Sequence, residues 1–360
     1  MKLSVTKRGM VQTSLGSIFY LLNDGRRTPQ KGIEEKLPIL CFHMSPRSSD
    51  EYLEVLPLLA SSGEASIEEN DEYSSINGRV VIAFDIPGYG ASENPPRSCT
   101  VDEISDAILM AADSILLSSE EKRNNEEEDE KNCSRNYITV GSLLGNFFCV
   151  SLASRYPERI KAVILTNPWY NPDAITTDSL SFSESKVALE DTFTLKDDGS
   201  HLVDLHSKRS GWLDPELNLR VVASEIAYLT NRRVRYPMGI NLPGANDYNF
   251  QTSMLKITEN NAQRGENGDS ITNFLYILGE SCATLFDQYG LVGTKRFEEA
   301  CNLLIPGDND DDATTSNNND NSIVVRVERL LGEKSTLNVV NQMPEEFAAL
   351  CNKFLTDCGL

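Results

Sequence analysis

The sequence is poor in the side chain that most often moves protons at neutral pH. Its 360 residues include three histidines, His43, His201 and His206, and no histidine follows position 206. Histidine is the residue whose ordinary pKa lies closest to neutrality. Any mechanism that takes a histidine from the C-terminal part of the chain is therefore excluded.

Long apolar runs and paired cysteines are absent as well. No apolar run reaches the length of about 18 residues that a membrane helix needs, and the first residues have no apolar signal core. We therefore expect a cytoplasmic protein without a membrane partner. The eight cysteines form no C-x-x-C pair, so neither a disulfide framework nor a metal site is expected. Cys41 and Cys149 lie in apolar runs typical of the core.

Basic residues are outnumbered by acidic ones. The chain has 33 Lys and Arg against 54 Asp and Glu, a formal net charge of -21. Such a surface repels phosphate backbones, so nucleic-acid partners are not expected. Much of the acid falls in two polar segments, 118–136 and 307–322, which are typical of solvated insertions. The charge therefore says little about a substrate, and no cofactor motif is found.

Predicted strands alternate with predicted helices along most of the chain. This order indicates βαβ units and a parallel sheet with helices on both faces. A capping box at Thr100 and Glu103 begins one helix, and Pro344 begins the last. The predicted hairpin and strands are Val11–Leu22, Pro38–His43, Arg79–Ile86, Tyr137–Gly141, Lys161–Asn167, Phe274–Gly279 and Ile323–Glu328.

The alternation stops in the middle of the chain. Residues 169–268 have helical stretches and no strand pattern, which predicts an inserted helical cap. The predicted organisation is thus a core made of 1–168 and 269–360, interrupted by this cap.

Three segments resemble the α/β-hydrolase superfamily. They are HMSPRSSDEYLEVLPLLA (43–60), FDIPGYGASENPP (84–96) and TVGSLLGNFFCVSLASRYPERIKAVILTNP (139–168). The resemblance covers most of the chain outside the cap and the two polar segments. It implies an eight-stranded, mostly parallel sheet, and a Ser-Asp-His triad in an ordinary member.

The nucleophile of this superfamily sits at the apex of a sharp strand-to-helix turn, here called the elbow (residues 141–145). The resemblance places Gly141 and Gly145 at the two positions that need small residues, and Leu143 at the apex. Ser142 is the alternative nucleophile. It would require Val140 and Leu144 at the small positions, where both would crowd the turn.

The other two triad positions also differ from the superfamily pattern. By resemblance, the acid position is Cys282, and the base position, about seven residues before Pro344, is Leu337. A thiol does not hold an imidazolium as a carboxylate does. An ordinary serine hydrolase is therefore not expected. The segments 43–52, 198–202 and 341–349 further resemble an uncharacterised branch that lacks the elbow serine.

Two kinds of function remain. The first is a non-catalytic binding or regulatory protein that binds a small apolar ligand or a protein partner, with a small-molecule pocket between cap and sheet. The second is an enzyme with displaced chemistry, hydrolase- or lyase-like, that uses His43, Cys282 or Ser142. Met44 replaces the glycine that often follows such a histidine, which leaves the oxyanion hole in question. The residues expected to line the pocket are His43, Met44, Leu143, Leu144, Trp169 and Cys282.

Overall fold

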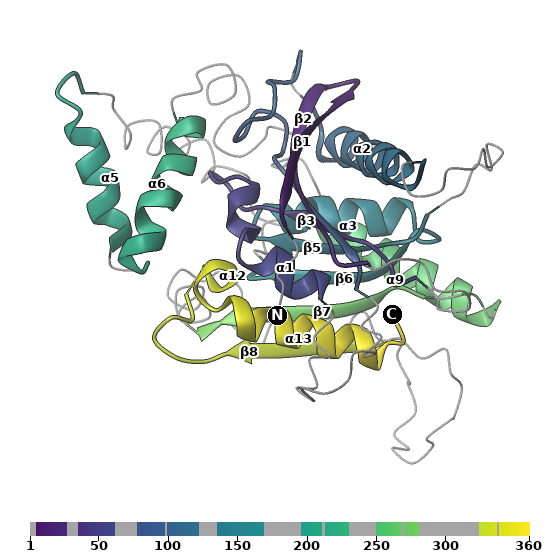
Figure 1. Cartoon of the computed structure of the whole chain (residues 1–360). Coiled ribbons are helices and arrows are strands. Elements are labelled where there is room, and N and C mark those ends of the chain that lie inside the picture. Colours follow the sequence, from purple (N-terminus) through teal and green to yellow (C-terminus); the bar gives the residue numbers. More distant parts are fainter. Residues whose placement is uncertain are drawn as a thin grey trace, which may run out of the picture.

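The structure is a computed structural model (Figure 1) built around one sheet. It describes residues 5–26, 35–61, 78–97, 99–121, 135–168, 196–210, 213–229, 250–267, 269, 271–280, 324–336 and 338–360. The sheet has eight strands in the order β1-β2-β4-β3-β5-β6-β7-β8. Their bounds are β1 Lys7–Thr13, β2 Gly16–Asp24, β3 Ile39–Phe42, β4 Val80–Phe84, β5 Tyr137–Ser142, β6 Ile160–Thr166, β7 Asn273–Gly279 and β8 Val325–Leu330.

The strand predictions are confirmed, with ends that shift by a few residues. β1 and β2 form the expected antiparallel hairpin, and β2 also pairs antiparallel with β4. All other neighbouring strands pair in parallel. The central strands are short apolar runs, buried on both faces, as expected for a parallel sheet covered by helices.

Helices cover both faces of the sheet (Figure 1). One layer contains η1 (Ser49–Tyr52), α1 (Val55–Ala60), α12 (Val339–Gln342) and α13 (Pro344–Asp357), which share one apolar core with the sheet. The other contains α2 (Val101–Glu121), α3 (Gly145–Arg155) and α9 (Phe250–Glu266), which share the second core. Cys41 and Cys149 are buried free thiols in these cores, as predicted.

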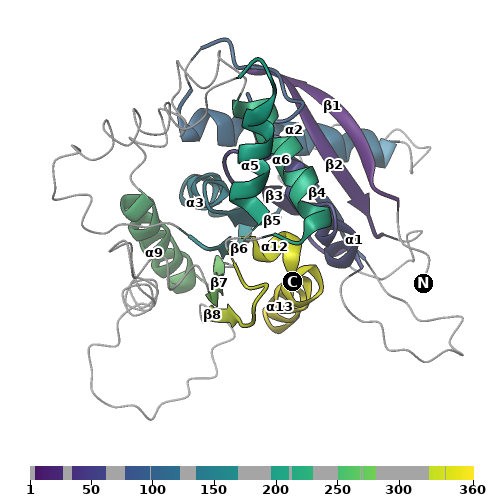
Figure 2. The same ribbon diagram turned by 90° about the vertical axis from the view of Figure 1, so that its left-hand side faces the viewer.

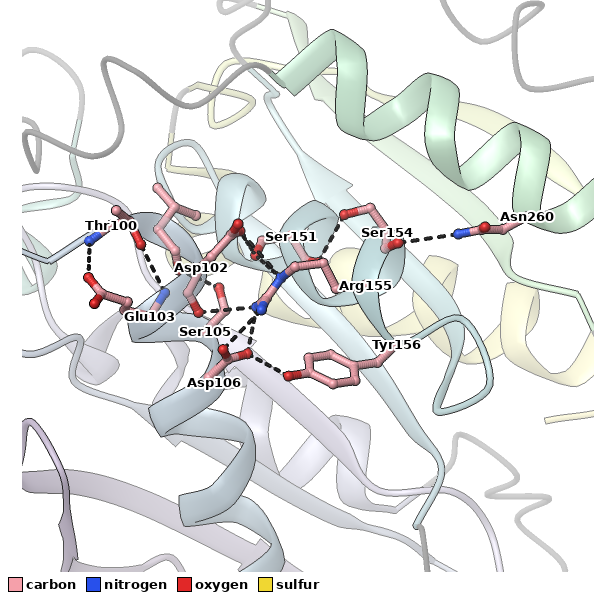
Figure 3. A network of polar contacts seen from close by, with 11 residues as sticks. Thr100, Asp102, Glu103, Ser105, Asp106, Ser151, Ser154, Arg155, Tyr156 and Asn260 are labelled. Atoms are coloured by element: carbon pink, nitrogen blue, oxygen red, sulfur yellow. Dashed lines mark hydrogen bonds and ion pairs between the residues drawn. The ribbon is translucent and has the colours of Figure 1, made fainter.

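Polar contacts fix the start of α2 and its packing on α3 (Figure 3). The predicted capping box forms, because Thr100 N donates to Glu103 Oε2 at 2.9 Å and Glu103 N donates to Thr100 Oγ1 at 3.1 Å. Arg155 of α3 donates to Asp106 of α2 at 2.9 Å, and Tyr156 donates to the same carboxylate. The two helices are thus tied together at their solvent-facing side.

The described part of the segment between β6 and β7 is helical. Helices α5 (Ser200–Ser210) and α6 (Pro215–Leu229) pair with each other and lie over the end of the sheet where β3 and β5 end (Figure 2). Helix α9 falls within the range predicted as a cap, but it packs on α3. The rings of Phe147 and Phe250 lie 5.6 Å apart, and Asn260 Nδ2 donates to Ser154 O at 3.2 Å. We therefore group α9 with the core layer.

Several predicted features lie outside the described residues. They include Trp169, Cys282, Leu337, the polar segment 307–322 and most of 118–136. No helix within the described ranges combines the length and apolarity needed to cross a bilayer.

Candidate functional site

The elbow between β5 and α3 has Leu143 at its apex. Leu143 has a φ of 47°, a left-handed conformation that non-glycine residues rarely adopt. Backbone hydrogen bonds hold it there, because Leu143 N donates to Thr166 O at 3.1 Å and Asn146 N donates to Leu143 O at 3.1 Å. This strand-to-helix turn is the kind that carries the nucleophile in α/β hydrolases. Its side chain here is a partly exposed hydrocarbon.

Close backbone packing explains the two glycines of the elbow. A Cβ on Gly141 would lie 2.7 Å from Asn146 N, and a Cβ on Gly145 would lie 2.0 Å from Phe42 O. Neither position has room for a side chain. The turn therefore has the register in which Leu143, and not Ser142, occupies the apex.

Ser142 is the last residue of β5 and is fully buried. Its Oγ donates to Glu51 Oε1 at 2.8 Å, and Met44 N donates to Glu51 Oε2 at 2.7 Å. Burial raises the pKa of Glu51, while Arg47 and these hydrogen bonds act in the opposite direction. The hydroxyl hydrogen of Ser142 is thus directed to a buried carboxyl group.

Sequence analysis did not identify Glu51 as a site residue. The Glu51–Ser142 contact joins residues 91 positions apart, so no local pattern indicates it. The one available signal was that Ser142 needs a polar partner if the elbow register buries it.

His43 is fully buried directly after β3, and both of its ring nitrogens bond to the backbone. Nδ1 lies 2.8 Å from Met44 O, and Ile86 N donates to Nε2 at 3.0 Å. Only the neutral ring with its hydrogen on Nδ1 satisfies both contacts. Burial lowers the pKa of His43 to about 4. In this arrangement neither nitrogen is available to take a proton from a nucleophile.

Asn167 is a site residue that sequence reasoning missed. It follows β6 with a φ of 45°, and its Oδ1 accepts from Gly279 N, at the end of β7, at 2.8 Å. Its Nδ2 donates to Thr336 O at 3.5 Å. Asn167 therefore connects the ends of β6 and β7 with Thr336, the residue before the predicted base position 337. Asparagine tolerates the left-handed region better than other non-glycine residues, which was the available signal.

Helix α6 contacts the same region through the loop after β3. Arg47 Nε lies 3.5 Å from Glu225 Oε1, and Ser48 Oγ lies 2.8 Å from Ser224 Oγ. Arg47 Nη1 also donates to Asn341 Oδ1 at 3.1 Å. These contacts place α6 beside the elbow network.

The predicted pocket residues are only partly brought together by the described structure. Leu143 is partly exposed, whereas His43, Met44 and Leu144 are buried. Trp169 and Cys282 lie outside the described residues. Within the described ranges, no three His, Cys, Asp or Glu side chains are grouped as a metal ion would require.

Comparisons with known proteins agree with this architecture. The family model of the alpha/beta hydrolase fold matches residues 38–355. A hydrolase from Pseudomonas aeruginosa PA01 is 16% identical over 97% of this chain and 98% of that chain, with a TM-score of 0.56. The enol-lactonase from Burkholderia xenovorans LB400 is 13% identical over 97% and 100%, with a TM-score of 0.57.

A haloalkane dehalogenase from Agrobacterium tumefaciens C58 is 17% identical over 98% of this chain and 97% of that chain, with a TM-score of 0.56. No curated protein sequence matches the chain. At these identities the solved structures establish the fold and leave the activity open. Together with the family match over nearly the whole chain, they show that this protein belongs to the α/β-hydrolase family.

Proposed function

We propose that this protein is a non-catalytic α/β-hydrolase relative that binds a small apolar ligand between the elbow and a cap formed by α5 and α6. The observation that carries the proposal is Leu143 at the apex of the elbow, with a φ of 47°. A leucine supplies no nucleophile and no acidic hydrogen. Its hydrocarbon side chain suits an apolar ligand.

The neighbouring polar groups support the same reading. The hydroxyl of Ser142 bonds to Glu51, and both nitrogens of His43 bond to the backbone. By resemblance, Cys282 and Leu337 replace the acid and the base. Loss of the nucleophile or base alone lowers the rate of a serine protease on the order of 10⁶-fold.

We further place the protein in the cytoplasm, because the cysteines in the described ranges are free thiols.

Covalent labelling tests the non-catalytic half of the proposal. We expect a fluorophosphonate to leave the unmodified protein unlabelled. The matched variant is Leu143→Ser, which restores a hydroxyl to the apex. Stoichiometric labelling of the unmodified protein that disappears in Ser142→Ala would overturn the proposal.

Thermal denaturation with straight-chain alcohols, from butanol to octanol, tests the binding half. A bound ligand raises the melting temperature according to its concentration relative to Kd. We expect stabilisation that grows with chain length and is lost in Leu143→Asp, which places a charge at the apex. Leu255→Asp, at an exposed leucine of α9, is the control and should retain it. Equal stabilisation of both variants would argue against a ligand at the elbow.

An enzyme with displaced chemistry is the alternative. One observation favours it, namely that Ser142 Oγ lies 2.8 Å from a buried carboxyl group whose pKa is raised by burial. A carboxylate of raised pKa is a stronger base than an exposed one. A thiol-directed probe tests the other candidate. Rapid labelling that is lost in Cys282→Ala would favour a cysteine nucleophile over the binding protein.

A further inference from the structure

Among the residues that the structure describes, polar side chains of α6 contact the segment that follows β3. Glu225 contacts Arg47, Ser224 contacts Ser48, and Arg220 forms an ion pair with Glu54. All three partners lie in the segment that follows β3. Neither of the two hydrophobic cores around the sheet includes a described residue of α5 or α6. The buried apolar residues Leu205 of α5, Val221 and Val222 of α6, and Leu213 just before α6 lie outside both cores.

The innermost of these contacts is a deeply buried ion pair. The side chains of Arg47 and Glu225 are 4% and 1% exposed. Taking both charges out of water offsets most of their mutual attraction, so such a pair fixes geometry more than it adds stability. Replacing Glu225 takes away the charged partner that α6 supplies to the buried Arg47, which favours movement of α6 away from the core. The Arg47–Glu225 pair is thus consistent with an α6 that is docked on the core and can move away from it.

The docked position of α6 is connected to the elbow through Glu51, whose backbone and side chain both form hydrogen bonds. Arg47 donates to Asn341 Oδ1 at 3.1 Å, and Asn341 Nδ2 donates to Glu51 O at 2.7 Å. The Glu51 carboxyl group then accepts from Ser142 Oγ and from Met44 N. Movement of Arg47 therefore bears on the loop that starts at Met44.

We propose that α6 is a polar latch over the elbow, closed by the Glu225–Arg47 pair, and that its docking orders the loop 44–48. Helices α5 and α6 open together, because they pack on each other. The proposed latch does not depend on a bound ligand. Its consequence for ligand access, which requires opening, rests on the proposed function.

Hydrogen–deuterium exchange of the full chain, read by mass spectrometry, tests the latch. The variant is Glu225→Gln, and the control is Glu216→Gln, which removes the same charge at an exposed position of α6. In Glu225→Gln we expect exchange in residues 218–226 to accelerate about tenfold or more, since one partner of a buried pair is lost. Residues 43–52 should accelerate as well, while residues 105–115 of α2 stay unchanged.

Two outcomes would overturn the latch. One is exchange in residues 218–226 that is no faster in Glu225→Gln than in Glu216→Gln. The other is equal acceleration in α2, which would mean that the pair stabilises the whole fold. Arg220→Gln, at the partly exposed ion pair, gives a milder opening should Glu225→Gln not fold, and it should accelerate the same residues. Exchange is measured without ligand, so the two proposals can be refuted separately. The exchange data can contradict the latch while alcohols still stabilise the protein, and alcohols can fail to stabilise the protein while the exchange data support the latch.

Discussion

Lowering the pH from 7.5 to 5 should destabilise this protein through His43. The ring is fully buried, and its Nε2 accepts a hydrogen bond from Ile86 N at 3.0 Å. A proton on Nε2 would face that amide hydrogen and break the bond. The folded protein therefore resists protonation of this ring, and the pKa of His43 falls from 6.5 to about 4 because of burial. The unfolded chain takes up the proton at its ordinary pKa.

The size of the effect follows from the two pKa values. The folded state binds fewer protons than the unfolded state between pH 6.5 and about 4, so stability falls as the pH falls through this window. With these values, His43 lowers the free energy of unfolding by about 2 kcal/mol between pH 7.5 and pH 5. The loss reaches about 3 kcal/mol once the pH is below both pKa values.

Urea denaturation at several pH values measures this loss, with His43→Gln as the comparison. Glutamine retains an acceptor for Ile86 N but has no titrating group in this range. The difference in stability between wild type and His43→Gln should change by about 2 kcal/mol from pH 7.5 to pH 5. His206→Gln, on helix α5, is the control for a general histidine effect. A difference that stays constant with pH would refute the assigned ring state, and with it the argument that His43 is unavailable as a base.

Two pairs of substitutions test the packing at the two ends of α3. Arg155→Ala, at the α2–α3 ion pairs, should lower the free energy of unfolding by about 1 kcal/mol, and by less at high salt, because the groups are partly exposed. Urea denaturation measures this change, and it should show a smaller one for Arg97→Ala, at a more exposed ion pair. Gly145→Ala should destabilise by about 1–3 kcal/mol or more, since its Cβ would lie 2.0 Å from Phe42 O. Gly265→Ala, in helix α9, should instead stabilise the protein by about 0.5–1 kcal/mol, because a Cβ there would have nothing within 4 Å. If thermal melts show a change of stability in the same direction for both glycine variants, the packing argument is contradicted.

Much of the fold could be predicted from the sequence because its signals are local. The runs at 38–43, 79–86 and 161–167 have apolar centres at 39–42, 80–84 and 162–165, which is what burial on both faces of a parallel sheet requires. The capping box at Thr100 lies within a single helical turn. The elbow register was predicted from Gly141 and Gly145, whose lack of space the structure explains.

The polar part of the candidate site was not predicted, because its contacts join distant segments. Glu51 meets Ser142 across 91 positions, and Arg47 meets Glu225 across 178. The apolar pattern of a segment does not indicate which of its charges are buried, since that depends on the partner. The grouping of α9 shows the same limit. Its sequence is helical wherever it packs, and contacts between distant segments, such as those of Phe250 with Phe147 and of Asn260 with Ser154, place it on the core.

The strained apex of the elbow changes how such turns should be interpreted. A positive φ at a residue other than glycine costs roughly 1–3 kcal/mol and often marks an active site. Here Leu143 adopts that conformation although leucine has no catalytic group. The hydrogen bond from Leu143 N to Thr166 O and the tight glycine contacts impose the conformation on whichever residue stands at the apex. Strain at this turn is therefore a property of the scaffold, and the chemistry depends on the side chain placed there.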